Sequence, residues 1–201
     1  MVQLNDFRLD VKGTIEQQMI AYLTYYGFTE VAEHSLAVAA EAKILAAKFS
    51  AEPKSAYIAG LLHDSSVFIP NKERVALCQT LNLSVYPEEK QVPMLLHQRL
   101  SKVLANEFFG VTDVSILNAI ECHTTLRNSP SKMDLIVFLA DKLQWDQSYA
   151  APYLDELNKA LETSLIHGAK TYIDWTLKKG VLVLHPWLSQ AKQWLDEYEE
   201  R

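Results

Sequence analysis

Cysteine is scarce in this sequence, and the two that occur, Cys78 and Cys122, form no CxxC pair. Neither a disulfide framework nor a cysteine-rich zinc site is indicated, and we expect two buried thiols in a reducing compartment. Long apolar runs are missing too: one of the longest, residues 135–140, is far shorter than the roughly 20 residues that span a membrane. The N-terminus lacks the basic and then apolar segments of a signal peptide. We therefore expect a cytoplasmic protein without a membrane partner.

Basic residues are fewer than acidic ones: the chain has 19 basic and 25 acidic residues, and its formal net charge is −6. This balance argues against a surface that coats nucleic acid, although it allows a small polyanionic substrate held by a metal. The sequence contains no glycine-rich phosphate loop, no GxSxG nucleophile motif and no internal repeat. No nucleic-acid partner is therefore expected.

What the sequence does contain is helical periodicity, and we predict an all-α fold. With 49% hydrophobic and 22% charged residues, the chain has the composition of one soluble domain covering residues 1–201. The motif Ser131-x-x-Asp134 has the form of a capping box, and the β-prone run 181–184 has no partner strand. The predicted helices cover residues 14–26, 29–49, 53–62, 72–81, 93–109, 112 or 113 to 123, 135–141, 152–179 and 187–200, with a loop at 82–91.

The pair His63-Asp64 ends an apolar helix that carries small residues at Ala56, Ala59 and Gly60. Small residues allow neighbouring helices to approach closely, so the imidazole and the carboxylate would emerge where helices meet. A charged aspartate at the end of a buried helix is costly unless something pairs with it, and a metal cation is one such partner. The simpler alternative is a helix C-terminus with a hydrogen-bonded histidine and a solvated aspartate.

The other histidines and one further aspartate favour the metal. Four histidines lie on or beside the apolar faces of four different predicted helices, and two aspartates end apolar helices: His34, His63, His97 and His123, with Asp64 and Asp141. Each alone would usually be an ordinary core residue. Together they suit Fe, Mn, Co, Zn or Ni, and a carboxylate can bridge two ions. His167 and His185 lie outside this pattern, and we interpret them as surface or structural residues.

The order His34 … His63-Asp64 … His97 … His123 … Asp141 resembles the HD-domain metal-dependent phosphohydrolases. More narrowly, it resembles the YqeK-like branch, which hydrolyses dinucleoside tetraphosphates symmetrically at a two-metal, usually di-iron, centre. The resemblance covers a metal-binding core at about residues 22–146, followed by C-terminal helices at about 152–200. It implies a compact HD-domain helical bundle.

Carried over residue by residue, the resemblance implies two metal ions, with iron expected and Mn, Co, Zn or Ni as alternatives. One ion would be held by His34, His63, Asp64 and Asp141, and the other by His97, His123 and the same Asp64 as a bridge. Asp64 would thus be a catalytic residue, and two ions bridged by hydroxide supply both a nucleophile and a clamp on phosphate oxygens. Arg127 fits a second catalytic role as a fork for the polyphosphate, with a solvated loop arginine as the alternative.

Three departures from the family pattern affect the expected substrate site. The lysine common after the HD pair is replaced by Ser65-Ser66, and Gln98-Arg99 stand where small residues are usual. The segment after Asp141 is also altered. Lys142 is a candidate phosphate contact, and Trp145 and Tyr149 are candidate stacking partners for a base, with core packing as the alternative for all three.

The resemblance implies an enzyme that cleaves diadenosine tetraphosphate to two ADP. The HDxxED motif of guanosine-tetraphosphate hydrolases and the GYP element of cyclic-dinucleotide phosphodiesterases are both absent. Two alternatives stay open: another HD-domain nucleotidase or phosphodiesterase, and a non-catalytic HD module that binds nucleotide. In either case we expect the protein to bind a nucleotide or a dinucleoside polyphosphate. The oligomeric state stays open, with a homodimer as one alternative.

Overall fold

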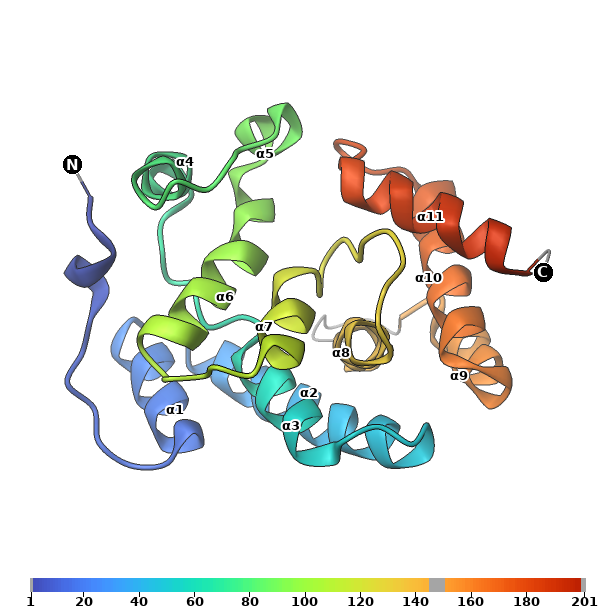
Figure 1. The fold of residues 1–201 in the computed structure, drawn as a ribbon, viewed down its shortest axis with the longest axis horizontal. Helices are drawn as coiled ribbons and strands as arrows, with labels where there is room; N and C mark the ends of the chain where they lie inside the picture. The colour runs from blue at the N-terminus through green and yellow to red at the C-terminus, as the bar shows by residue number, and fades with distance from the viewer. Residues whose placement is uncertain (1, 145–150, 200–201) are drawn as a thin grey trace.

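The computed structural model describes residues 2–144 and 151–199, and every regular element in these ranges is a helix, which confirms the all-α prediction (Figure 1). Two 3-10 helices accompany the α-helices. In chain order the elements are η1 Leu4–Phe7, α1 Ile15–Tyr25, α2 Thr29–Lys48, α3 Pro53–Leu62, α4 Asn71–Thr80, α5 Pro87–Gln91, η2 Pro93–Leu96, α6 His97–Glu107, α7 Val114–Glu121, α8 Lys132–Leu143, α9 Leu154–Thr163, α10 Leu165–Lys179 and α11 Pro186–Glu199.

Helix α8 is the centre of the fold. Figure 1 shows it end-on, with α2, α3 and α7 on one side and α9, α10 and α11 on the other. Every residue from Met133 to Ala140 is buried, as expected for a helix that is apolar on most of its circumference. Ser131 caps the helix by accepting from Asp134 N, which confirms the predicted capping box. The helix therefore carries Asp141, in its last turn, into the interior.

Helices α2 and α3 approach each other at Gly60. A Cβ atom added there would lie 2.9 Å from Ala39 Cα and 3.0 Å from the Val38 carbonyl oxygen, both backbone atoms of α2. Only a residue without a side chain allows this approach. The small residues Ala56 and Ala59 are likewise fully buried. The predicted close contact of helices beside His63 is therefore present.

Two of the predicted elements are wrong. The single helix expected over 152–179 is two helices, because Ser164 adopts an extended conformation (φ −168°, ψ 163°) and its side chain caps α10 at His167 N. The loop expected over 82–91 contains the short helix α5. Apolar periodicity continues through Ser164, so it does not reveal the break there, whereas α5 begins at Pro87, a residue suited to the first turn of a helix. The run 181–184 forms no strand in the described structure.

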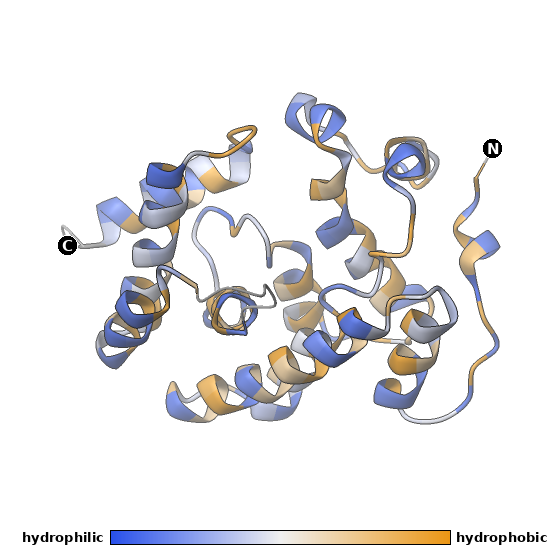
Figure 2. Ribbon diagram, turned by 180° about the vertical axis from the view of Figure 1, so that it is seen from behind, coloured by the Kyte–Doolittle hydropathy of each residue, from blue (hydrophilic) through white to orange (hydrophobic). Residues whose placement is uncertain are grey.

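Cys78 and Cys122 are free and buried, as predicted, and burial raises the pKa of the Cys78 thiol to about 11. Within residues 2–144 and 151–199, none of the helices combines the length and the apolar character that crossing a membrane requires. Figure 2 shows why for several of them: hydrophilic and hydrophobic residues alternate along the helices. This pattern is typical of helices with one face on a core and one in water.

Replacing Gly60 tests the close approach of α2 and α3. We expect Gly60→Ala to lower the free energy of unfolding by about 1 to 3 kcal/mol, because the new methyl group meets backbone that cannot rotate away. Gly168→Ala is the matched control, since its methyl group meets only the Leu161 and Leu139 side chains. Urea titrations of both variants measure the difference, and equal effects would contradict the role assigned to Gly60.

Candidate metal centre

The ends of five helices place six side chains at one point. His34 lies in the second turn of α2, His63 and Asp64 follow α3 directly, and His97 is the first residue of α6. The other two come from the segment after α7 and from the last turn of α8: His123 and Asp141. The structure therefore brings together all six residues that the sequence predicts as ligands.

Three of the histidines are oriented in the same way. The Nδ1 atoms of His63, His97 and His123 lie 2.7, 2.6 and 2.9 Å from the carbonyl oxygens of Gly60, Met94 and Ile120, each three residues earlier. Because a carbonyl only accepts, each Nδ1 carries the proton and donates it. In a neutral ring this leaves the Nε2 lone pair facing the centre, which is the arrangement that a metal ligand requires.

One half of the centre is formed around Asp141. Its Oδ1 lies 3.2 Å from His34 Nε2 and 3.6 Å from His63 Nε2. Its Oδ2 accepts from Lys142 Nζ. The donor atoms of these two histidines and Asp141 lie within 4.8 Å of one another, close enough to surround one ion.

The other half is formed around Asp64, whose two oxygens face different histidines. Oδ2 lies 3.4 Å from His63 Nε2, whereas Oδ1 lies 3.2 Å from His97 Nε2 and 3.4 Å from His123 Nε2. A carboxylate with one oxygen on each side has the shape of a bridging ligand.

Three features of this donor set fit metal ions. His97 Nε2 and His123 Nε2 lie only 3.0 Å apart, and two lone pairs at this distance repel unless a cation lies between or beside them. Among the described residues, His63 Nε2 and Asp64 Oδ1 are buried without a hydrogen-bond partner. Imidazole nitrogens combined with carboxylate oxygens suit first-row divalent metals. The residues present therefore fit the metal that the sequence predicts.

The electrostatics of the site are those of a cation pocket. Burial acts to lower the pKa of His63, but the Asp64 and Asp141 carboxylates outweigh it and raise that pKa to about 10. Burial acts to raise the pKa values of both aspartates, yet His63 beside Asp64 and Lys142 beside Asp141 hold them well below their usual range. In contrast, burial lowers the pKa of His123 to about 4. The two carboxylates therefore favour positive charge at this point of the interior.

Residues 31–146, more than half of the chain, match the family described as HD domain. The chain belongs to the HD domain family. HD domains bind divalent metals, and the chain is an HD-domain hydrolase. The family resemblance predicted from the six-residue order is therefore confirmed.

Two relatives and one solved structure illustrate the similarity. A protein of Lactococcus lactis subsp. cremoris, described as an uncharacterized protein in the pepC 5' region, is 45% identical over 141 residues, 70% of this chain and 72% of its own. The symmetrical bis(5'-nucleosyl)-tetraphosphatase of Bacillus subtilis (strain 168) is 29% identical over 151 residues, 73% of this chain and 80% of its own. A predicted HD superfamily hydrolase involved in NAD metabolism from Clostridium acetobutylicum shares the fold, with a TM-score of 0.82 and 29% identity over 90% of this chain and 96% of the other.

Two departures from the HD pattern have structural explanations that the sequence did not reveal. Ser66 Oγ donates to the His97 carbonyl (2.8 Å), and Ser101 Oγ donates to Ser66 Oγ (3.0 Å), so the segment after Asp64 is tied to α6. Gln98 Oε1 accepts from the backbone of Thr124 and Thr125 at 3.2 and 3.3 Å. This amide holds the segment after His123 against α6. Both contacts position ligand-bearing segments and were missed because they join distant parts of the chain.

Arg127 has a partner that the sequence did not indicate. Its Nε and Nη2 donate to Asp134 Oδ2 at 3.0 and 2.6 Å, and Asp134 is fully buried. The same oxygen accepts from Ser131 N at 2.8 Å. Arg127 is thus not a solvated loop residue, and its guanidinium group is not free of protein contacts. Two of its nitrogens stabilise a buried carboxylate at the start of α8. Its predicted roles in catalysis and phosphate binding stay predictions.

Lys142 lies at the candidate metal centre, where its Nζ donates to Asp141 Oδ2. The same Nζ lies over the rings of Phe138 and Tyr172, 5.4 and 5.7 Å from their centroids. Trp145 and Tyr149, the two predicted stacking residues, lie outside the described residues. A polar cleft of about 190 Å³ opens onto the centre. It is lined by His34, Asp64, Asp141, Lys142, Gln144, Tyr153 and Tyr172.

The remaining histidines lie away from the ligands. His167 is exposed on α10, whereas His185 is buried, with its Nδ1 accepting from Trp187 N at 3.1 Å at the start of α11. Of the two roles expected for these residues, surface or structural, His185 has the structural one. It packs against Tyr86 and Trp187, with ring centroids 5.3 and 5.8 Å away.

The orientation of Asp64 predicts the behaviour of a variant. We expect Asp64→Ala to lose bound metal and hydrolytic activity together, because its two oxygens face histidines of both halves of the centre. Elemental analysis of the purified protein and a phosphate-release assay measure the two losses. His167→Ala is the control and should retain both, and full metal content in Asp64→Ala would exclude a bridge.

Proposed function

We propose that this HD-domain hydrolase is a two-metal phosphohydrolase that cleaves dinucleoside tetraphosphates symmetrically. The observation that carries the two-metal part is the orientation of Asp64, with one oxygen toward His63 and the other toward His97 and His123. Six donor side chains also exceed what one ion with open positions needs. Iron is the metal we propose, since four imidazoles and two carboxylates suit it.

The proposed substrate comes from the relatives. The Bacillus subtilis protein bears the name symmetrical bis(5'-nucleosyl)-tetraphosphatase, and the similarity extends over most of both chains. A polyanionic substrate also agrees with the cation pocket, because the cleft combines Lys142 with donors that hold cations. The chain carries a net charge of −6, so the attraction must be local.

In this mechanism the residues of the chain bind, orient and neutralise. When bound, two metal ions supply a hydroxide nucleophile at neutral pH and a clamp on phosphate oxygens. His34, His63 and Asp141 would hold one ion, His97 and His123 the other, and Asp64 both. Lys142, already in contact with Asp141, would add positive charge beside the phosphates.

The Clostridium acetobutylicum structure favours a second candidate, since its description places that hydrolase in NAD metabolism. A dinucleotide joined by a pyrophosphate is then the alternative substrate. It shares two nucleosides and a phosphoanhydride with the first candidate but has a shorter phosphate chain.

Product analysis separates the two candidates. With diadenosine tetraphosphate we expect two molecules of ADP and no ATP or AMP, because a centre that binds the two central phosphates would favour hydrolysis of the anhydride between them. Chromatography of reactions with the tetraphosphate, NAD and a deoxynucleoside monophosphate measures this. ATP plus AMP would contradict symmetrical cleavage, and cleavage of NAD alone would favour the second candidate.

Replacing Arg127 distinguishes a phosphate contact from a structural ion pair. Arg127→Ala leaves buried Asp134 without its charged partner, so we expect the free energy of unfolding to fall by about 3 kcal/mol or more. A phosphate contact would also raise KM or lower kcat by roughly ten- to a hundredfold while metal content stays constant. Arg127→Lys is the control for charge. Normal kinetics in a destabilised Arg127→Ala protein would leave Arg127 with a structural role only.

A further inference from the structure

A cavity of about 270 Å³ lies between α8, α10 and the segment before α11, and most of its wall is apolar. Phe138 from α8 and Tyr172 and Ile173 from α10 form one side. Val181, Leu182 and Val183 form the other. Thr124, Thr125, Val92 and Leu95 complete the part nearest to α6.

This cavity adjoins the metal centre. Lys142 and Tyr172 line both the cavity and the polar cleft, so both hollows border the same two side chains. Thr124, another wall residue, has its Oγ1 3.1 Å from His97 Nε2. For a substrate with its phosphates at the ligands, the cavity would therefore be the neighbouring space beyond Lys142 and Tyr172.

The segment 181–184 exposes apolar side chains at the edge of this cavity. Leu182 is 91% exposed and Val181 37%. Both ends of the segment are held, because Gly180 takes a φ of +93° that favours glycine and His185 caps α11. Water-exposed apolar side chains held at the edge of an apolar cavity indicate a surface that a ligand covers.

One buried polar atom of a residue in the cavity wall has no partner. Within the described residues, Thr176 Oγ1 is buried without a hydrogen-bond partner, whereas His185 Nε2 faces the buried Glu89 carboxylate, 3.5 Å from its Oε1. Buried polar groups are normally paired, so an unpaired one beside a cavity is a site where a ligand can bind. An apolar wall with a few polar groups is the usual composition of a small-molecule site.

We propose that this cavity binds a nucleobase of the substrate, an inference that rests on the proposed function. The flat faces of the base would pack against Tyr172 and Leu182, and its polar edge would reach Thr176 Oγ1. Helix α10 and the segment 181–184 would therefore bind the base.

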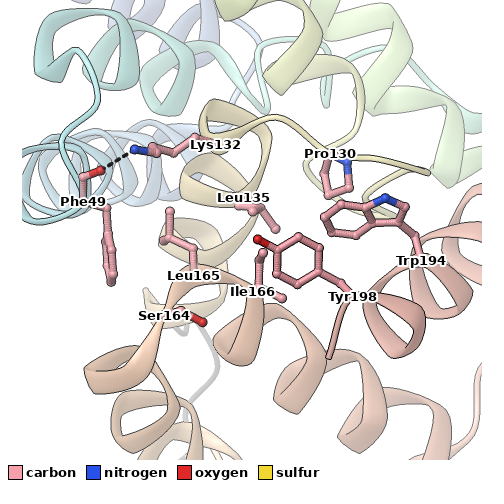
Figure 3. Close-up of a pocket in the computed structure, with 9 residues that line it drawn as sticks. All are labelled: Phe49, Pro130, Lys132, Leu135, Ser164, Leu165, Ile166, Trp194 and Tyr198. Carbon is pink, nitrogen blue, oxygen red and sulfur yellow. Dashed lines mark hydrogen bonds between the residues drawn. The ribbon is translucent and has the colours of Figure 1, made fainter. Parts of the chain in front are cut away.

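A larger cavity, of about 360 Å³, lies at the other end of α8 and fits this role less well (Figure 3). It is lined by residues such as Leu135, Trp194 and Tyr198, and by none of the six ligands. Lys132 beside it donates to the Phe49 carbonyl at 2.8 Å, as Figure 3 shows. Lys132 and Asp141 are nine residues apart on the helix, or about 13 Å.

Filling the cavity from the segment 181–184 tests the proposal. Val183→Trp places a large ring in the cavity, and Leu184→Trp is the matched control, because Leu184 is in the same segment but not in the described cavity wall. Calorimetry on the metal-loaded protein measures the binding of ADP, the expected product, and of inorganic pyrophosphate, which has no base. We expect Val183→Trp to weaken ADP binding about tenfold or more and to leave pyrophosphate binding unchanged.

A second variant needs no change in the interior. Leu182→Ser removes an exposed side chain, so the fold should be retained, and ADP binding should weaken by about three- to tenfold. Val114→Ser is its control, since Val114 is also exposed, at 66%, and lies outside the cavity. Unchanged ADP binding in both Val183→Trp and Leu182→Ser, or equal weakening of pyrophosphate, would overturn the proposal.

The same experiment separates this inference from the proposed function. Wild-type protein that binds ADP through the cavity but cleaves no tetraphosphate would contradict the function and support the base site. Wild-type protein that cleaves the tetraphosphate but binds ADP no more tightly than pyrophosphate would support the function and overturn the base site.

Discussion

The approach of α2 to α3 at Gly60 is the constraint on which the site depends. The missing side chain allows the α3 backbone to lie against Ala39 and Val38, and this brings His34 of α2 beside the end of α3. The Gly60 carbonyl also accepts from His63 Nδ1 and orients that ring. Gly60 therefore allows the close approach of two ligand-bearing helices, and the backbone of the same residue orients a ligand.

Charge is concentrated where the helices meet, although the interior around it is apolar. Two aspartates and four imidazoles are held within a few ångströms, and burial of the carboxylates alone would be costly. Lys142 offsets part of this cost at Asp141, and the two carboxylates raise the pKa of His63 beside them. The fold is thus arranged around positive charge that metal ions would supply, as expected for an HD domain.

The all-α fold and the clustering of the six candidate ligands could be predicted from the sequence for the same reason. His63 and Asp141 lie at the ends of apolar helices, and caps such as Ser131 and Thr14 are local signals that helix boundaries follow. Contacts across the chain carry no such signal. The pairing of Arg127 with Asp134, the amide of Gln98 and the break at Ser164 depend on neighbours or backbone conformations that periodicity does not encode. The cavity beside Lys142 is likewise a property of packing between α8 and α10.

The central claim is that Asp64 joins two metal ions, and anomalous X-ray diffraction from crystals of the metal-loaded protein tests it most directly. Data collected on the two sides of the metal's absorption edge should show two peaks about 3.5 to 4 Å apart. One peak should lie among His34, His63 and Asp141, the other beside His97 and His123, with Asp64 in contact with both. A single peak, or two peaks of which only one contacts Asp64, would contradict the account.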